Sequence, residues 1–400
     1  MDIIERFLKY VSYETTSNEE SETVPSSDKE IVLLKELVKD MEALGLKAKY
    51  QGGFSYGEIK SDCGKKDTIF LMAHVDTSPD ASGKDIKPRI VHFDGAPIKL
   101  NEDKVLDPKV FESMCYHLNH DLIVTDGTTL LGGDDKAGVA IILDTVEKII
   151  KRGNYPNIKI CFSPDEEIGR GTYGIDLDYI KKDTDKIYAY TVDGGEIMGF
   201  SYENFNAASA KVIVEGVSIH PSIGKNKLIN AMEVINEFHE TLPKCRPENT
   251  EGREGFIHLV GMKGLVEKAE YVYILRSFDK DELESFKNAF YKAMDEINNK
   301  YNKSLVTVEI KDSYKNMKEV IDKYPYTVDI VHEVYKEMGI PCVDWPIRGG
   351  TDGATLSHMG LPCPNLGTGG DNFHGVYEYL DIDEMKTMVE IITKIMDKLK

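Results

Sequence analysis

The sequence predicts an α/β fold, in which a doubly wound, mostly parallel sheet receives an inserted α+β domain. Three short, nearly continuous apolar runs are typical of strands that are buried on both faces. They span residues 68–73, 158–163 and 187–192. Helical patterns alternate with strand patterns up to about residue 200, which favours a parallel sheet with helices on both faces.

The chain opens with two helical patterns. Residues 3–11 repeat apolar side chains at helical spacing. Ser27 and Glu30 have the spacing of a capping box, and the helix that follows is expected to end near Gly45. Residues 78–120 interrupt the alternation because they are rich in Asp, Pro and Gly. We expect them to form a long excursion near the sheet edge.

The pattern changes from about residue 208. A strand, a helix, two strands, a helix and a strand follow in that order, which is the ferredoxin-like arrangement. We therefore expect residues 208–317 to form a domain inserted into a larger one made of residues 1–207 and 318–400. In the last part, helices are expected over 328–338 and 385–399, with a strand near 362–366.

Composition excludes several classes of protein. The net charge of −20, from 49 Lys and Arg against 69 Asp and Glu, argues against a general nucleic-acid binder. No apolar stretch is long enough for a membrane helix, and the first residues lack the pattern of a signal peptide. None of the six cysteines forms a CxxC motif, so a thiolate zinc site is not expected. A reducing cytoplasm fits these features.

Metal-binding residue types follow each of the three buried runs. His74 and Asp76 follow the first run, Glu166 and Glu167 the second, and Asp193 the third. In open α/β sheets, ligands collect at the carboxyl ends of the strands, so these side chains are expected to converge. Two further segments could join them there, around Asp134 and around His374.

A two-metal hydrolase needs about five protein ligands, one of them a carboxylate shared by both ions. The candidate ligands are His74, Asp134, Glu167, Asp193 and His374. Asp134 stands where a helix begins and is the candidate bridge, whereas Asp76 is placed to hold the second ring nitrogen of His74. Glu166 is then left as the base that activates water.

Each of these residues has an ordinary alternative. A single histidine is more often a satisfied polar residue, Asp134 alone would serve as a helix N-cap, and Asp193-Gly194 alone would be a turn. The joint pattern is harder to explain in that way, because independent turns need not follow three buried strands. Gly349-Gly350-Thr351-Asp352-Gly353 lacks the Lys of a P-loop, and no GxSxG motif is present.

The motifs resemble those of the peptidase T family, the tripeptide aminopeptidases of a zinc-dependent exopeptidase group that includes aminoacylases and glutamate carboxypeptidases. The resemblance runs nearly end to end. The stretches that carry it include residues 74–80, 130–138, 163–167, 190–195, 203–209, 348–354 and 361–366. The stretches at 204–209 and 348–354 are more particular to peptidase T than the metal-site motifs. Asp371 departs from the family pattern, which has an aromatic residue there.

The resemblance implies two zinc ions on the five candidate ligands, with Asp134 bridging, and Asp76 and Glu166 as the catalytic pair. It implies that the inserted domain is a lid and dimerisation domain of a homodimer. It also implies substrate-binding roles for three residues, His220, Arg276 and Arg348. The two arginines would meet the terminal carboxylate of the substrate. Without the resemblance, each of the three residues is as easily a surface or salt-bridged side chain.

The expected function is that of a cytoplasmic zinc aminopeptidase that releases the N-terminal residue of tripeptides. A dipeptidase or an aminoacylase with the same metal site is the alternative within the class. A non-catalytic relative that serves as a binding protein is the alternative outside it. Such relatives usually lose the base or a ligand, whereas Glu166 and all five candidate ligands are present here.

Overall fold

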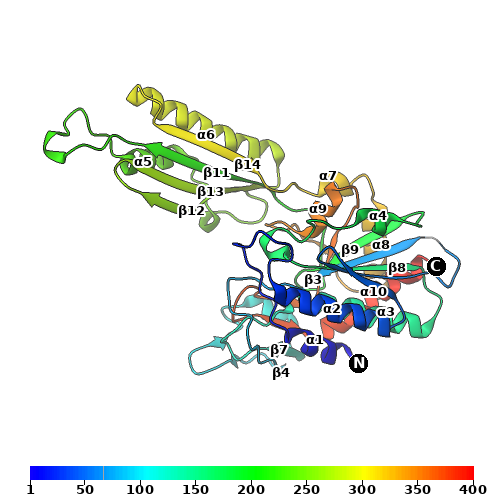
Figure 1. Cartoon of the computed structure of the whole chain (residues 1–400). Helices are drawn as coiled ribbons and strands as arrows, with labels where there is room; N and C mark the ends of the chain where they lie inside the picture. The colour runs from blue at the N-terminus through cyan, green and yellow to red at the C-terminus, as the bar shows by residue number, and fades with distance from the viewer. Residues whose placement is uncertain (66) are drawn as a thin grey trace. The chain divides into compact units, whose positions relative to one another are not determined.

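The computed structural model describes residues 1–65 and 67–400 and divides into two compact units (Figure 1). The first unit comprises Met1–Tyr202, Met317–Trp345 and Thr351–Lys400. The second comprises Glu203–Asn316 and Pro346–Gly350. Arg348 therefore groups with the second unit, although the sequence pattern had placed residues 318–400 in the larger domain.

The first unit contains the main sheet, whose strand order is β1-β2-β8-β3-β9-β16-β10-β15. Its centre is parallel and consists of β8 (Asn157–Ser163), β3 (Thr68–His74) and β9 (Ile187–Val192). These are the three predicted apolar strands, and β3 and β8 are buried along their whole length. The other strands are β1 (Lys47–Gln51), β2 (Phe54–Ile59), β16 (Asn365–Leu366), β10 (Gly199–Ser201) and β15 (Val343–Asp344).

Helices cover both faces of this sheet, as predicted for a doubly wound fold. Alternate side chains of β3 enter two different cores: Ile69 and Leu71 enter one, and Phe70 and Met72 the other. The first core includes α1 (Ile3–Val11), α2 (Asp28–Ala43), α3 (Gly133–Arg152), α8 (Tyr326–Met338) and α10 (Ile382–Lys398). The second includes α4 (Leu177–Lys181) and α9 (Asp352–His358). The predicted capping box of Ser27 and Glu30 is present at the start of α2.

The segment 78–120 is more regular than the sequence suggested. It contains β4 (Arg89–Phe93), β5 (Ile98–Lys99), β6 (Val105–Leu106) and the 3₁₀ helix η1 (Glu112–His117). β4 joins a second sheet in the order β17-β18-β7-β4. Its other strands are β17 (Gly370–Asp371), β18 (Tyr379–Asp381) and β7 (His120–Val124). These strands are short and lie among polar turn residues, so the sequence pattern does not predict them.

The second unit has the predicted ferredoxin-like order. Its strands are β11 (Asn206–Glu215), β12 (Phe256–Gly264), β13 (Lys268–Ser277) and β14 (Val306–Asp312). They pair antiparallel in the order β12-β13-β11-β14, and α5 (Ala231–Thr241) and α6 (Lys280–Tyr301) share one apolar core with them. Among the residues that the structure describes, no helix has the length and apolar character needed to cross a membrane.

Candidate metal centre

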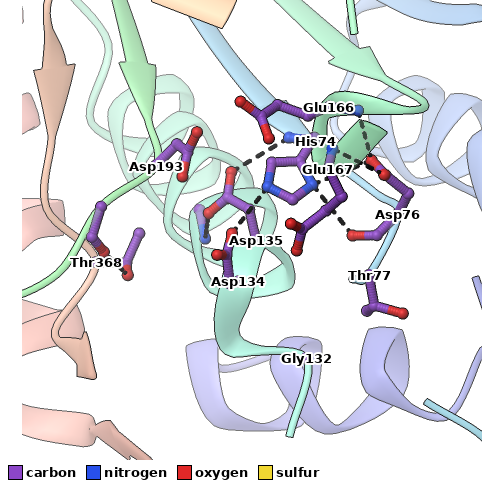
Figure 2. A network of polar contacts seen from close by, with 12 residues as sticks. His74, Asp76, Thr77, Gly132, Asp134, Asp135, Glu166, Glu167, Asp193 and Thr368 are labelled. Carbon is purple, nitrogen blue, oxygen red and sulfur yellow. Dashed lines mark hydrogen bonds and ion pairs between the residues drawn. The ribbon is translucent and has the colours of Figure 1, made fainter. Parts of the chain in front are cut away.

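His74 lies at the carboxyl end of β3, and its imidazole is almost fully buried (Figure 2). Its Nδ1 lies 3.1 Å from the carbonyl oxygen of Asp76 and 3.2 Å from Oδ1 of the same residue. Its Nε2 lies 2.8 Å from Oδ1 of Asp134. When Nδ1 carries the proton and donates to Asp76, Nε2 presents a lone pair to a carboxylate. A cation, either a proton or a metal ion, is then required between Nε2 and Asp134.

Asp134 is held by the loop that leads into α3. Gly132 has a φ of 76°, and Asp134 itself has a non-helical backbone, so the regular helix begins after it. The buried carboxylate of Glu378 accepts hydrogen bonds from the amides of Leu131, Gly132 and Asp134, at 2.6, 3.0 and 3.1 Å. These bonds fix the backbone that presents Asp134. No sequence pattern had singled out Glu378.

Asp135 is a second residue that no sequence pattern marks as part of the site. Its Oδ1 accepts from the amide of Gly138 and caps the regular part of α3, and its Oδ2 accepts from the amide of His74. Both bonds are 3.2 Å long. A Cβ at Gly138 would lie 1.9 Å from the carbonyl oxygen of Val192, so glycine lets the helix approach β9 closely. Asp135 therefore joins the end of β3 to the start of α3.

Glu166 and Glu167 begin the 3₁₀ turn η2 (Glu166–Ile168), which follows β8. Their amides donate to the two carboxylate oxygens of Asp76, at 3.0 and 3.1 Å. Oε2 of Glu167 lies 2.8 Å from Nε2 of His374. Oε1 of Glu167 is buried and has no hydrogen-bond partner among the described residues. A buried carboxylate oxygen without a donor is costly unless a cation satisfies it.

His374 lies between β17 and β18 and has a φ of 62°, a left-handed conformation that is uncommon for residues other than glycine. Its Nε2 is also 3.4 Å from Oδ2 of Asp134. The two oxygens of Asp134 are thus directed to two different imidazoles. Asp193 follows β9, and the structure brings it into one group with His74 and Asp135, in which the potential ligand atoms all lie within 4.8 Å of one another.

The centre carries more negative than positive charge. Burial, with the neighbouring charge of Asp134, raises the pKa of Asp193 to about 7. Burial and the charge of Asp193 raise the pKa of Glu166 well above its ordinary value. Hydrogen bonds to Asp134 and Glu167 raise the pKa of His374 to about 11. Crowded buried carboxylates of this kind are stabilised by cations, and a set of imidazole and carboxylate donors suits zinc and similar ions.

The three expected substrate-binding residues all lie in the second unit. The Arg348 guanidinium donates to the carbonyl oxygens of Gly252 and Glu254, at 2.7 and 3.1 Å, and stacks on Phe205. The Arg276 guanidinium donates to the backbone carbonyl oxygen of Leu275 at 2.9 Å and lies over the ring of Tyr314. An arginine has five N–H donors, so these contacts leave others for a ligand.

His220 precedes the 3₁₀ turn η3 (Pro221–Ile223). Its Nδ1 lies 2.8 Å from the hydroxyl of Ser222 and 3.3 Å from the amide nitrogen of the same residue. The ring therefore caps the turn through Nδ1, so any contact with a substrate would use Nε2.

The fold and this centre are those of a metal-dependent peptidase. The chain belongs to Peptidase family M20/M25/M40, whose family model matches residues 124–398. It is 45% identical over 405 residues to Peptidase T of Clostridium acetobutylicum, with 99% of this chain and 98% of the relative covered. It is also 45% identical over 407 residues to Peptidase T of Caldanaerobacter subterraneus subsp. tengcongensis, with the same coverage. The resemblance to peptidase T is thereby confirmed, and the chain is a metallo-aminopeptidase.

Solved structures share the fold. Aminopeptidase PepT from Bacillus cereus superposes with a TM-score of 0.78 at 20% identity, over 99% of this chain and 98% of that one. A dinuclear metal-binding peptidase of the M20 family from Bacillus subtilis superposes with a TM-score of 0.65 at 12% identity, over 98% of this chain and 96% of that one. At such identities, the likeness establishes the fold, including its mostly parallel sheet.

Proposed function

We propose that this chain removes the N-terminal residue of tripeptides with the help of two zinc ions. The observation that carries the proposal is the position of Asp134, whose two carboxylate oxygens face the Nε2 atoms of His74 and His374. A carboxylate placed in this way suits a ligand that bridges two ions. The proposed ligands are His74, Asp134, Glu167, Asp193 and His374. Zinc is preferred because the donors are imidazole and carboxylate.

When bound, a pair of zinc ions polarises a carbonyl and lowers the pKa of water. The residues of the chain perform the proton transfers. Glu166 takes a proton from the attacking water and later gives it to the leaving amine. Asp76 fixes the ring of His74 and accepts hydrogen bonds from the amides of Glu166 and Glu167, so it positions both the base and a ligand.

Selection of tripeptides requires a group that binds the far end of the substrate. We propose Arg348 and Arg276 for the terminal carboxylate, because guanidinium pairs with carboxylate through two parallel hydrogen bonds. His220 is proposed to stabilise the oxyanion through Nε2, since its Nδ1 is occupied by Ser222. In this proposal the second unit is a lid that carries these three residues.

We propose further that the second unit forms a homodimer contact. β12 is an edge strand of its sheet, and apolar side chains near the end of β12 are exposed. Val260 is 50%, Met262 65% and Leu265 63% exposed. An apolar edge of this kind is normally covered by a partner. A cytoplasmic location is proposed as well, because the described cysteines are all free thiols.

The proposal is tested with the full-length enzyme after its metals are removed by a chelator and restored with zinc. A free tripeptide, a dipeptide and an N-acylated amino acid are assayed in parallel. We expect zinc to restore activity, with the tripeptide hydrolysed fastest and its N-terminal residue released first. Faster hydrolysis of the N-acylated amino acid would identify an aminoacylase instead, and faster hydrolysis of the dipeptide a dipeptidase.

A further inference from the structure

A second cluster of histidine and carboxylate side chains lies in the first unit and shares no residue with the candidate metal centre. His117 ends η1, His120 opens β7, and Asp381 ends β18. The Nδ1 atoms of His117 and His120 lie 2.8 Å and 2.6 Å from one and the same atom, Oδ2 of Asp381. His117 and Asp381 are fully buried, whereas the side chain of His120 is 35% exposed. The cluster is therefore accessible on one side only.

Asp381 is held in a fixed orientation. Its Oδ1 accepts from the amides of Asp383 and Glu384, at 2.8 and 3.0 Å, and so caps α10. Its Oδ2 is left to the two imidazoles. Oε1 of Glu384 lies 3.8 Å from Nδ1 of His117 and offers a fourth donor atom. Two imidazole nitrogens and two carboxylate oxygens are a donor set that zinc accepts in tetrahedral sites.

The proton balance of His117 also favours a cation at this position. Its Nε2 is buried and has no hydrogen-bond partner among the described residues. When Nδ1 carries the only ring proton, Nε2 is a buried acceptor without a donor, which is costly. When Nε2 carries it, Nδ1 and Oδ2 of Asp381 are two acceptors 2.8 Å apart, so a cation must lie between them, either a second ring proton or a metal ion.

A carboxylate that would stabilise a proton on Nε2 of His117 is that of Glu196. Glu196 is among the charges that act on His117, and its Oε2 is also buried without a hydrogen-bond partner among the described residues. An Nε2–H group on His117 would lie in the field of this carboxylate. Such a charge favours the tautomer with the proton on Nε2, which leaves Nδ1 as the ligand atom.

We propose that His117, His120 and Asp381, with Glu384 as the fourth ligand, form an additional binding site for a divalent transition-metal ion, zinc by its donor set. The ion would join η1, β7 and the start of α10. β18 pairs with β17, and Asp371 of β17 lies opposite Tyr379 of β18. These two strands flank the loop of His374, so the ion would brace the segment that presents a ligand of the candidate metal centre.

Metal content per chain tests the proposal without an activity assay. The full-length protein is purified, stripped with a chelator, titrated with Co²⁺ or Zn²⁺, and analysed for bound metal. His120→Asn retains a hydrogen-bond donor next to Asp381 but is a poor ligand, and we expect it to bind one metal ion fewer than the wild type. His92→Asn is the matched control, because His92 is an exposed histidine that pairs with a single carboxylate among the described residues, that of Asp121 at 2.9 Å. It should bind as much metal as the wild type.

Asp134→Ala separates the two sites. Because this variant weakens both positions of the candidate centre, we expect it to retain one tightly bound ion, with the visible absorption of tetrahedral Co²⁺, and to gain thermal stability when one equivalent of metal is added. Combining it with His120→Asn should abolish the absorption and the gain in stability. Circular dichroism verifies that the variants are folded. Equal metal content in folded wild type and His120→Asn, or no bound metal in Asp134→Ala, would overturn the proposal and leave a metal-free hydrogen-bonded cluster.

Discussion

The backbone amide of Glu166 donates a hydrogen bond of 3.0 Å to Oδ1 of Asp76. The same oxygen lies 3.2 Å from Nδ1 of His74, so one carboxylate contacts the segment of the proposed base and the ring of a proposed ligand. Asp76 is fully buried, which prevents water from competing for these bonds. The base and the imidazole are therefore held by the same residue, although β8 and β3 supply them separately.

Glu166→Gln should lose most of its activity and keep its metal. The carboxylate is proposed to transfer protons and not to bind the ions, and general acid–base catalysis contributes about 10²- to 10⁴-fold. We expect kcat to fall by about that factor, while elemental analysis gives the metal content of the wild type. Glu22→Gln, which removes an exposed carboxylate, is the control. A folded, metal-loaded Glu166→Gln enzyme with normal turnover would exclude the role of base.

Asp134→Ala should release metal from both positions of the candidate centre. The residue faces His74 and His374 through different oxygens, so its loss removes a ligand from each side. We expect a fall in affinity at both positions of at least about 10-fold, measured by competition with a chromogenic chelator. If both ions stay bound as tightly as in the wild type, Asp134 does not bridge them.

Much of the fold could be predicted because it follows from periodicity. β3 and β8 are apolar along their length since both faces of the sheet are covered, and α2 begins at a capping box that can be read in the sequence. The four-stranded sheet that contains β4 could not be predicted, because its strands show no such periodic pattern. Its short strands lie among turn residues and are stabilised by partners distant in sequence, such as β18.

The candidate site could be predicted only in part, because only some of its residues follow a recognisable sequence pattern. Residues at strand ends, such as His74 and Asp193, are marked by the apolar runs before them. Glu378 has no such mark. Its function depends on three backbone amides more than two hundred residues earlier, which only the folded chain brings together. Asp135 likewise has no mark of its own in the sequence, because it follows Asp134 directly in the first turn of α3.

Asp352 should make the stability of the metal-free protein depend on pH. Burial, with the charge of Asp193, raises its pKa to about 8, despite partial compensation from His74. The unfolded chain ionises this group near pH 4, whereas the folded protein retains the proton. The contribution of the protonated Asp352 side chain to the free energy of unfolding is therefore complete below pH 4 and is lost as the pH rises toward 8.

Asp352→Asn removes this dependence. With a chelator present, we expect the variant to be more stable than the wild type at pH 8, by about a few kcal/mol in the free energy of unfolding, and to differ little near pH 4. Urea unfolding at the two pH values measures the difference. The exposed Asp103→Asn should show no such change. A variant less stable than the wild type at pH 8 would mean that the carboxylate is ionised in the folded protein.

Arg348→Ala tests whether the enzyme measures its substrate by the terminal carboxylate. The guanidinium already donates to Gly252 and Glu254, so a purely structural role is the rival explanation. The two roles differ in their dependence on substrate. A hydrogen bond between charged groups contributes about 1.5–3 kcal/mol, or roughly ten- to a hundredfold in kcat/KM. A tripeptide amide lacks the terminal charge and forms no such bond.

We therefore expect Arg348→Ala to lower kcat/KM for a free tripeptide by about ten- to a hundredfold and to affect the corresponding amide much less. Arg253→Ala is the matched control, because this arginine also belongs to the second unit and stacks on an aromatic ring, that of Phe278, but pairs with Glu203. It should leave the preference for the free acid unchanged. Equal losses on both substrates, with a lower melting temperature, would assign Arg348 to the support of residues 250–254, and Arg276 would become the candidate for the carboxylate.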